Sequence, residues 1–175
     1  MVYLDLSRNA FEGETHLAAL SPYSREMALT EPGSDDVLIS DDDSGATNWA
    51  AQTASSSPLS YLNLSRNQFT GCIPEAIGGL TSLNTLDLSR NKLEGHVPSD
   101  LGGCRELRVL SLSCCGLSGH LDGSDGGRAP VNNGGGLGRL ALLESLRLDG
   151  NLFEGSVPAA LGNLTRLEVL QLQVF

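Results

Sequence analysis

The stretch LSYLNLSRNQFTGCIPEAIGGLTSL, from Leu59 to Leu83, leads directly into LNTLDLSRNKLEGHVPSDLGGCREL, from Leu83 to Leu107. The two stretches carry matching residues with a period of 24 positions. A fixed period of roughly 20 to 29 residues indicates a chain built from stacked coils, one coil for each repeat. The shared positions are Leu62, Leu64, Asn67, Phe69, Gly71, Ile73, Pro74, Ile77 and Leu80, which recur as Leu86, Leu88, Asn91, Leu93, Gly95, Val97, Pro98, Leu101 and Cys104.

Each repeat is expected to begin with a short strand. Leu62 and Leu64 are two residues apart, so both face the core, while the residues beside them face outward. Asn67 follows where the chain turns, and its side-chain amide can satisfy backbone groups of its own and the adjacent repeat. Gly71 permits a bend, and Pro74 ends the sheet pairing and can start a short helical segment.

One coil buries too little apolar surface to be stable alone, so the coils must stack and complete a parallel sheet. We therefore expect an α/β repeat solenoid, with short parallel β-strands on the concave face and short helical, 3₁₀ or irregular segments on the convex face. About five to six repeats and two loop insertions fit the chain. With 21 glycines and 5% aromatic residues, the composition suits a leucine core with many tight turns.

The pattern extends beyond the two opening stretches. Leu4 to Gly13 supplies a first copy, and Leu107 to Leu121 supplies another in which Cys115 replaces the asparagine. Leu143 to Leu164 is again regular, and a last strand begins at Leu167. The asparagines expected to form a structural ladder are Asn9, Asn67, Asn91 and Asn151.

Two segments interrupt the period and define the predicted organisation. Residues 1–20 form the first repeat, residues 21–58 an acidic Ser/Asp-rich insertion predicted to be disordered, and residues 59–175 the solenoid. An alternative for the first insertion is one eroded repeat around residues 37–40. A Gly-rich loop insertion over residues 122–136 should lengthen the convex return and leave the sheet undisturbed.

The pattern L-x-x-L-x-L-S-x-N-x-L-x-G-x-I/V-P-x-x-L-G-x-L occurs almost whole from Leu83 to Leu107 and from Leu143 to Leu167. With its G-x-I/V-P step at Gly71, Gly95 and Gly155, the chain resembles the plant-type leucine-rich repeat family. Ectodomains of that family occur in receptor-like kinases, receptor-like proteins and secreted inhibitors of polygalacturonases. The resemblance implies an extracellular or cell-surface location, although the sequence itself contains no signal peptide and no transmembrane segment. A fragment of a longer receptor would fit these features.

Outward positions on the strands form columns across the concave face, a rigid polar surface suited to a protein or peptide ligand. The alternative is that they are solvated strand positions without a partner. Arg8, Arg66 and Arg90 add a basic row, which could serve a ligand or pair internally with Asp5 and Asp87. The candidate ligand-binding residues are Tyr3, Asp5, Ser7, Tyr61, Asn63, Ser65, Thr85, Asp87, Ser89, Ser111, Arg147, Asp149 and Gln171.

The cysteines do not have the spacing of a metal site, and we expect neither a metal nor another cofactor. Cys104 replaces a leucine and should pack as a small hydrophobe. Cys115 replaces an asparagine and should leave its turn slightly under-satisfied, since a thiol is a weak donor. Cys72 should be exposed. No histidine lies at a spacing that links it to a carboxylate or a nucleophile, so we expect no enzymatic activity and no catalytic residue.

Two sequons are present, at Asn63 and Asn163, and a glycan on Asn63 would cover the concave face. The formal charge of −10 makes nucleic acid and anionic membrane surfaces poor partners. Uncapped coil ends could support self-association. The leading hypothesis is a non-enzymatic protein or peptide recognition module of a receptor ectodomain. The alternatives are an inhibitor of cell-wall hydrolases, and a truncated fragment without activity of its own.

Overall fold

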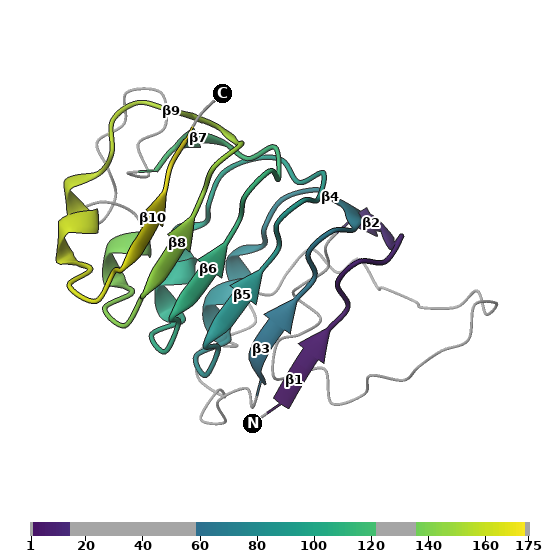
Figure 1. Ribbon diagram of the computed structural model, residues 1–175, viewed down its shortest axis with the longest axis horizontal. Helices are drawn as coiled ribbons and strands as arrows, with labels where there is room; N and C mark the ends of the chain where they lie inside the picture. Colours follow the sequence, from purple (N-terminus) through teal and green to yellow (C-terminus); the bar gives the residue numbers. More distant parts are fainter. Residues whose placement is uncertain (1, 15–58, 122–135, 174–175) are drawn as a thin grey trace, which may run out of the picture.

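The computed structural model describes residues 2–14, 59–121 and 136–173. In these parts of the chain, six short parallel strands lie side by side in one sheet (Figure 1). Their order in the sheet is β1, β3, β5, β6, β8 and β10, which is also their order in the sequence. The strands are β1 (Val2–Asp5), β3 (Leu59–Asn63), β5 (Thr85–Asp87), β6 (Val109–Ser111), β8 (Ser145–Arg147) and β10 (Val169–Gln171). The predicted solenoid with a parallel sheet is confirmed.

The strands pair in the register that the sequence pattern predicts. Leu62 aligns with Leu86, Leu86 with Leu110, and Leu110 with Leu146. Because β6 pairs directly with β8, the second insertion leaves the sheet continuous. β1 likewise pairs directly with β3, so these two strands are neighbours in the sheet.

Short 3₁₀ helices form the side of each coil opposite the strands (Figure 1). They are η3 (Glu75–Gly79), η4 (Ser99–Gly103), η5 (Gly136–Arg139) and η6 (Ala159–Asn163). The prolines that precede three of them adopt extended backbone conformations, with φ between −72° and −66° at Pro74, Pro98 and Pro158. Each proline therefore stands just before its helix, where its missing N–H costs no hydrogen bond.

A second set of strand pairs, which the sequence reasoning did not anticipate, lies just after the asparagine turns. β2 (Glu12–Glu14) pairs with β4 (Gln68–Thr70), and β7 (Ser118–His120) pairs with β9 (Leu152–Glu154), both in parallel. Gly71, Gly95 and Gly155 then turn the chain with φ between 76° and 81°. This is the left-handed region that glycine tolerates best, so the predicted bend is present at these residues.

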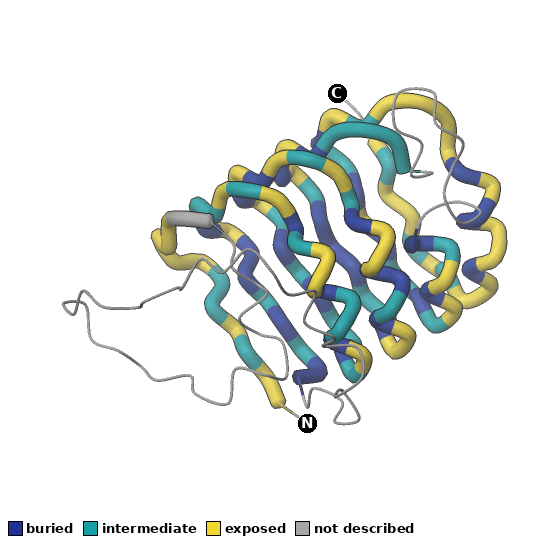
Figure 2. Tube along the Cα trace, turned by 180° about the vertical axis from the view of Figure 1, so that it is seen from behind, coloured by how far each residue is buried: buried dark blue, intermediate teal, exposed yellow. Residues whose placement is uncertain are grey.

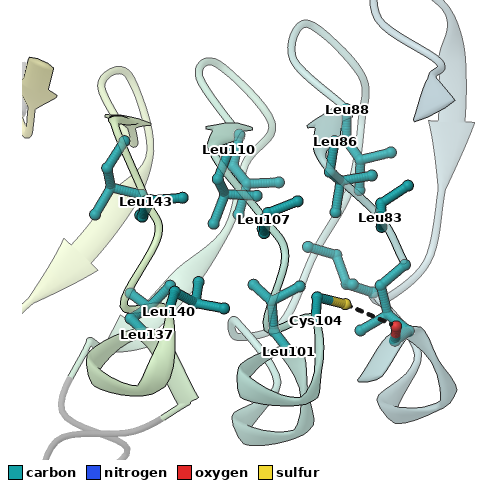
Figure 3. Close-up of a cluster of buried hydrophobic side chains, with 14 of the residues drawn as sticks. Leu83, Leu86, Leu88, Leu101, Cys104, Leu107, Leu110, Leu137, Leu140 and Leu143 are labelled. Atoms are coloured by element: carbon teal, nitrogen blue, oxygen red, sulfur yellow. Dashed lines mark hydrogen bonds between the residues drawn. The ribbon is translucent and has the colours of Figure 1, made fainter. Parts of the chain in front are cut away.

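The core is a stack of leucine columns between the sheet and the helices (Figure 3). Leu86, Leu110 and Leu146 are fully buried and lie in adjacent strands. Cys104 is also fully buried among the leucines, as predicted, and its thiol donates to the carbonyl of Ile77 at 3.1 Å. Buried residues recur at the same places in successive coils, while the outer bends are largely exposed (Figure 2).

The predicted asparagine ladder connects adjacent coils. Asn67 donates to the carbonyl of Leu6 in the preceding coil at 2.8 Å and to that of Leu64 in its own coil at 3.0 Å. Its Oδ1 accepts the amide of Phe11 at 3.3 Å. Asn91 and Asn151 bridge neighbouring coils in the same way. Asn9, in the first coil of the structure, donates to the carbonyls of Leu6 and Ser7 in its own coil.

Cys115 takes the ladder position in its coil. Its thiol donates to the carbonyls of Leu88 at 3.2 Å and of Ser113 at 3.6 Å, so it partly replaces an amide donor. It has no oxygen that could accept the amide of Leu93, the counterpart of the Phe69 amide that Asn91 accepts at 3.1 Å. Burial raises the pKa of the Cys115 thiol to about 12. Cys115 therefore forms weaker hydrogen bonds in this turn than an asparagine would, as the sequence predicts.

Two predicted segments fall largely outside the described residues. The acidic insertion over residues 21–58 lies wholly outside them, as does the Gly-rich insertion except for its last residue. Gly136 is instead the first residue of η5, and it is buried. The backbone of the adjacent coil approaches it closely, because a Cβ on Gly136 would lie 2.0 Å from the carbonyl oxygen of Ser99. Among the described residues, no helix is long and apolar enough to cross a membrane.

Candidate functional site

The concave face of the sheet is hollowed by a groove of about 630 Å³. Its walls come from the second half of each strand and the turn that follows, so every coil contributes residues at equivalent positions. The hollow is polar throughout. Its lining residues are Asp5, Ser7, Arg8, Asn63, Ser65, Arg66, Asp87, Ser89, Arg90, Ser111, Ser113, Arg147, Asp149 and Gln171.

The structure brings most of the predicted ligand-binding positions into this hollow. Tyr3, Tyr61 and Thr85 instead lie one column away, in a register-matched row at the start of the strands. Ser65 and Ser111 line the hollow but are each only 7% exposed, so they offer a partner little surface. The columns of outward residues are continuous because the strands are parallel and in register. The burial of the two serines depends instead on the distance between adjacent coils.

Four further residues line the hollow, Ser113 and the three arginines of the basic row that the sequence offered either to a ligand or to internal pairing. Ser113 occupies the same column as Ser89, and its hydroxyl donates to Asp149 Oδ1 at 2.6 Å. Arg8, Arg66 and Arg90 come directly before the ladder asparagines, where each adopts φ of 57°. This left-handed turn carries them to the rim of the hollow. The basic row that the sequence analysis described is therefore part of the lining of the hollow.

An aromatic pair marks one corner of the concave face. The rings of Tyr3 and Tyr61 stack with centroids 5.1 Å apart. The side-chain amide of Asn63 donates to the hydroxyl of Tyr61 at 3.3 Å. Tyr3 remains 64% exposed although it is held in the stack. The pair therefore presents an apolar surface beside the polar hollow.

The carboxylates of the hollow are engaged by neighbouring donors. Asp5 Oδ1 accepts the backbone amide of Ser7 at 2.9 Å, and Asp87 Oδ1 accepts that of Ser89 at 2.9 Å. Hydrogen bonds from Ser7 are the main cause that lowers the pKa of Asp5, with smaller contributions from Asn63 and the charge of Arg8. These local turns fix the orientation of both carboxylates.

The arginines of the hollow form no ion pair with another residue in the part of the chain that the structure describes. Among the described residues, the one ion pair joins Arg108 to Glu144, at the start of the strands. The alternative that Arg8, Arg66 and Arg90 serve internal pairing is therefore not supported. The hollow carries four guanidinium groups and three carboxylates, so its net charge is positive while the chain as a whole is acidic.

The remaining candidate groups lie away from one another. Asn163 is exposed at the end of η6. Asn63 is half-buried on the concave face, and its Oδ1 accepts the amide of Ser65 at 3.0 Å. Cys72 is exposed, as expected. Among residues 2–14, 59–121 and 136–173, no cluster of three or more His, Cys, Asp or Glu side chains could hold a metal ion.

Comparisons with known proteins agree with this architecture. The leucine-rich repeat family models match residues 57–117 and 142–164. A comparison with curated proteins gives no match. The fold matches the plant peptide hormone receptor RGFR1 in complex with RGF2, with a TM-score of 0.68, 24% identity and coverage of 99% of this chain and 21% of that one.

Two other solved structures are more similar in sequence. The PEPR1–AtPEP1 complex is 28% identical over 98% of this chain, with a TM-score of 0.67. The Arabidopsis thaliana receptor kinase HAESA, with the peptide hormone IDA and the co-receptor SERK1, is 32% identical over 66% of the chain, with a TM-score of 0.57. This chain spans 18% of the length of each of those chains. With its repeat models, its register and these neighbours, the chain is a plant-type leucine-rich repeat protein.

Proposed function

We propose that the chain is a non-enzymatic recognition module that binds a protein or peptide in the concave hollow. Its setting would be the ectodomain of a plant-type receptor-like protein or receptor-like kinase. The observation that carries the proposal is the hollow itself, a groove of about 630 Å³ whose side chains come from successive strands of a continuous sheet. Side chains on such strands are held in place before a partner arrives, which lowers the entropy lost on binding.

The structural neighbours support a ligand-binding role. Two of them are structures of complexes, PEPR1 with AtPEP1, and HAESA with the peptide hormone IDA and the co-receptor SERK1. The chain covers only a small part of those ectodomains, so its ligand cannot be transferred from them. An inhibitor of cell-wall hydrolases stays the alternative prediction.

The chemistry of the hollow is better suited to binding than to catalysis. A general acid or base works best with a pKa near the working pH. The hydrogen bonds around Asp5 move the pKa of its carboxyl away from neutrality. The lining consists of serines, carboxylates, amides and guanidinium groups, without a histidine or cysteine among them. Such groups form hydrogen bonds and ion pairs with a ligand.

A displayed library of random peptides, selected against the purified full chain, would test the proposal. The selected peptides should lose about tenfold or more in affinity for the double variant D87A/R147A, since truncation of a few central contacts typically costs more than 1 kcal/mol each. The matched control is D100A/R105A, which also removes one acid and one base, both exposed on the convex side.

The folded state of both variants would be checked by urea denaturation. Loss of affinity confined to D87A/R147A, in a variant that remains folded, supports recognition in the hollow. Selected peptides that bind D87A/R147A as well as the parent chain would show that the concave face is not the binding site.

A further inference from the structure

We propose that the ligand of the hollow is an extended acidic peptide whose carboxylates pair with Arg8, Arg66 and Arg90, here called the arginine row. Its apolar side chains would lie on the opposite edge of the sheet, against Tyr3, Tyr61 and Val109, here called the apolar edge. This inference rests on the proposed function and names the class of ligand. It also runs against the charge of the whole chain, which is −10.

The charge balance of the hollow is the first argument. Its carboxylates already accept hydrogen bonds, Asp5 from Ser7, Asp87 from Ser89 and Asp149 from Ser113. Its guanidinium groups form no ion pair with any described residue. A guanidinium presents a planar fork of donors that matches a carboxylate, and it is less strongly hydrated than an ammonium group. The guanidinium groups are therefore available to an anionic ligand, whereas the carboxylates are already partly engaged by neutral donors.

The backbone holds the arginine row in place. The three arginines share φ of 57° and the same position in consecutive coils. The amide of Arg8 donates to the carbonyl of Ser65 at 2.9 Å, and that of Arg66 to the carbonyl of Ser89 at 2.8 Å. With adjacent strands about 4.8 Å apart, the row spans roughly 10 Å. The equivalent positions in the next coils are Cys114 and Gly150, so the row marks only the N-terminal half of the groove.

The apolar edge sets the orientation of the ligand. Tyr3, Tyr61 and Val109 belong to one register-matched row of the sheet, in which Thr85 lies between Tyr61 and Val109, while the arginine row follows the ends of the strands. Successive side chains of an extended peptide point to opposite sides. A peptide that runs across the strands with alternating acidic and apolar residues would place its acids on the row and its apolar groups on this edge. An acidic polysaccharide would leave the apolar edge unmatched.

A defined probe makes the inference testable. We would use a fluorescent octapeptide of alternating glutamate and leucine with blocked ends, and the equivalent glutamine–leucine and lysine–leucine peptides. Binding to the full chain would be followed by fluorescence anisotropy at low and high salt. The glutamate peptide should bind roughly tenfold more tightly than the glutamine peptide, since three exposed charge pairs each contribute a small amount. Its affinity should fall as salt rises.

The key variant is R8N/R66N/R90N, because asparagine tolerates positive φ better than other non-glycine residues. It should lose the preference for glutamate over glutamine. The matched control R105N/R139N/R166N removes the same charge from exposed arginines outside the hollow and should keep that preference. Equal binding of the three peptides, or a preference that survives in R8N/R66N/R90N, would overturn the inference. Tighter binding of an oligogalacturonate than of the glutamate peptide would overturn the choice of a peptide.

The library selection described above separates this inference from the proposed function. If selected peptides need Asp87 and Arg147 but show no excess of acidic residues, the concave face binds peptides and the inference about charge fails alone. If no selected peptide depends on the hollow, both fail. An acidic excess that disappears when the selection is repeated on R8N/R66N/R90N supports both.

Discussion

Replacement of Cys115 by asparagine should stabilise the solenoid. Cys115 occupies the ladder position but lacks the oxygen with which Asn91 accepts the amide of Phe69 at 3.1 Å. In C115N the side-chain oxygen would accept the amide of Leu93, and its amide would replace the weak thiol donor that reaches the carbonyl of Leu88 at 3.2 Å. Each hydrogen bond contributes about 1 kcal/mol net, so we expect a gain of about 1 to 2 kcal/mol.

Urea denaturation under reducing conditions would measure this gain. With a slope of roughly 2 kcal/mol per molar urea, the midpoint should rise by about 0.5 to 1 M. The reciprocal variant N91C is the matched control, and it should be less stable because it loses the acceptor of the Phe69 amide and two donors, to Leu64 at 3.0 Å and to Leu88 at 2.7 Å. A midpoint for C115N at or below that of the parent chain would refute the reasoning.

Three further predictions concern the stability of the folded chain. G150A should lose about 1 to 3 kcal/mol, measured by the urea midpoint, because Gly150 has φ of 67° and a Cβ there would lie 2.7 Å from Cys114 Sγ. S145A should gain about 1 kcal/mol in the same assay, since among the described residues the Ser145 hydroxyl is the one buried side-chain polar atom without a partner. Stability should fall as pH rises above about 9, because burial raises the pKa of Cys104 and Cys115 to about 12 while the unfolded thiols ionise earlier; the double variant C104A/C115A should lose much of this dependence in urea titrations at increasing pH.

The repeat pattern was sufficient to predict the fold because the information is local. Leu86 and Leu88 alternate with outward residues, and this alternation by itself assigns the strand and its buried side. Asn91 and Pro98 mark the turn and the start of the helical segment through their own hydrogen-bonding properties. Copies at a constant spacing then require neighbouring strands to pair in register, which the structure confirms.

The candidate site could be predicted only in outline. The columns on the concave face follow from register, so Asp87 and Arg147 could be placed on it from the sequence. Whether such residues are accessible or paired depends on distances between coils, which the sequence does not contain. Ser65 and Ser111 are outward residues of their strands, yet neighbouring coils bury them.

The sequence by itself therefore determined the solenoid, its leucine core, its asparagine ladder and the face on which polar residues gather, since each depends on residues within one repeat and on a fixed period. Only the tertiary structure showed that β1 pairs directly with β3 across the first insertion and that a second set of strands follows the turns. It also showed that Arg66 and its equivalents adopt a left-handed conformation and form no ion pair with another described residue. These features depend on the packing of adjacent coils and on the hydrogen bonds and ion pairs that form between them. The positive charge of the hollow in an acidic chain has another origin, because the folding of successive coils brings four arginines and three aspartates together there.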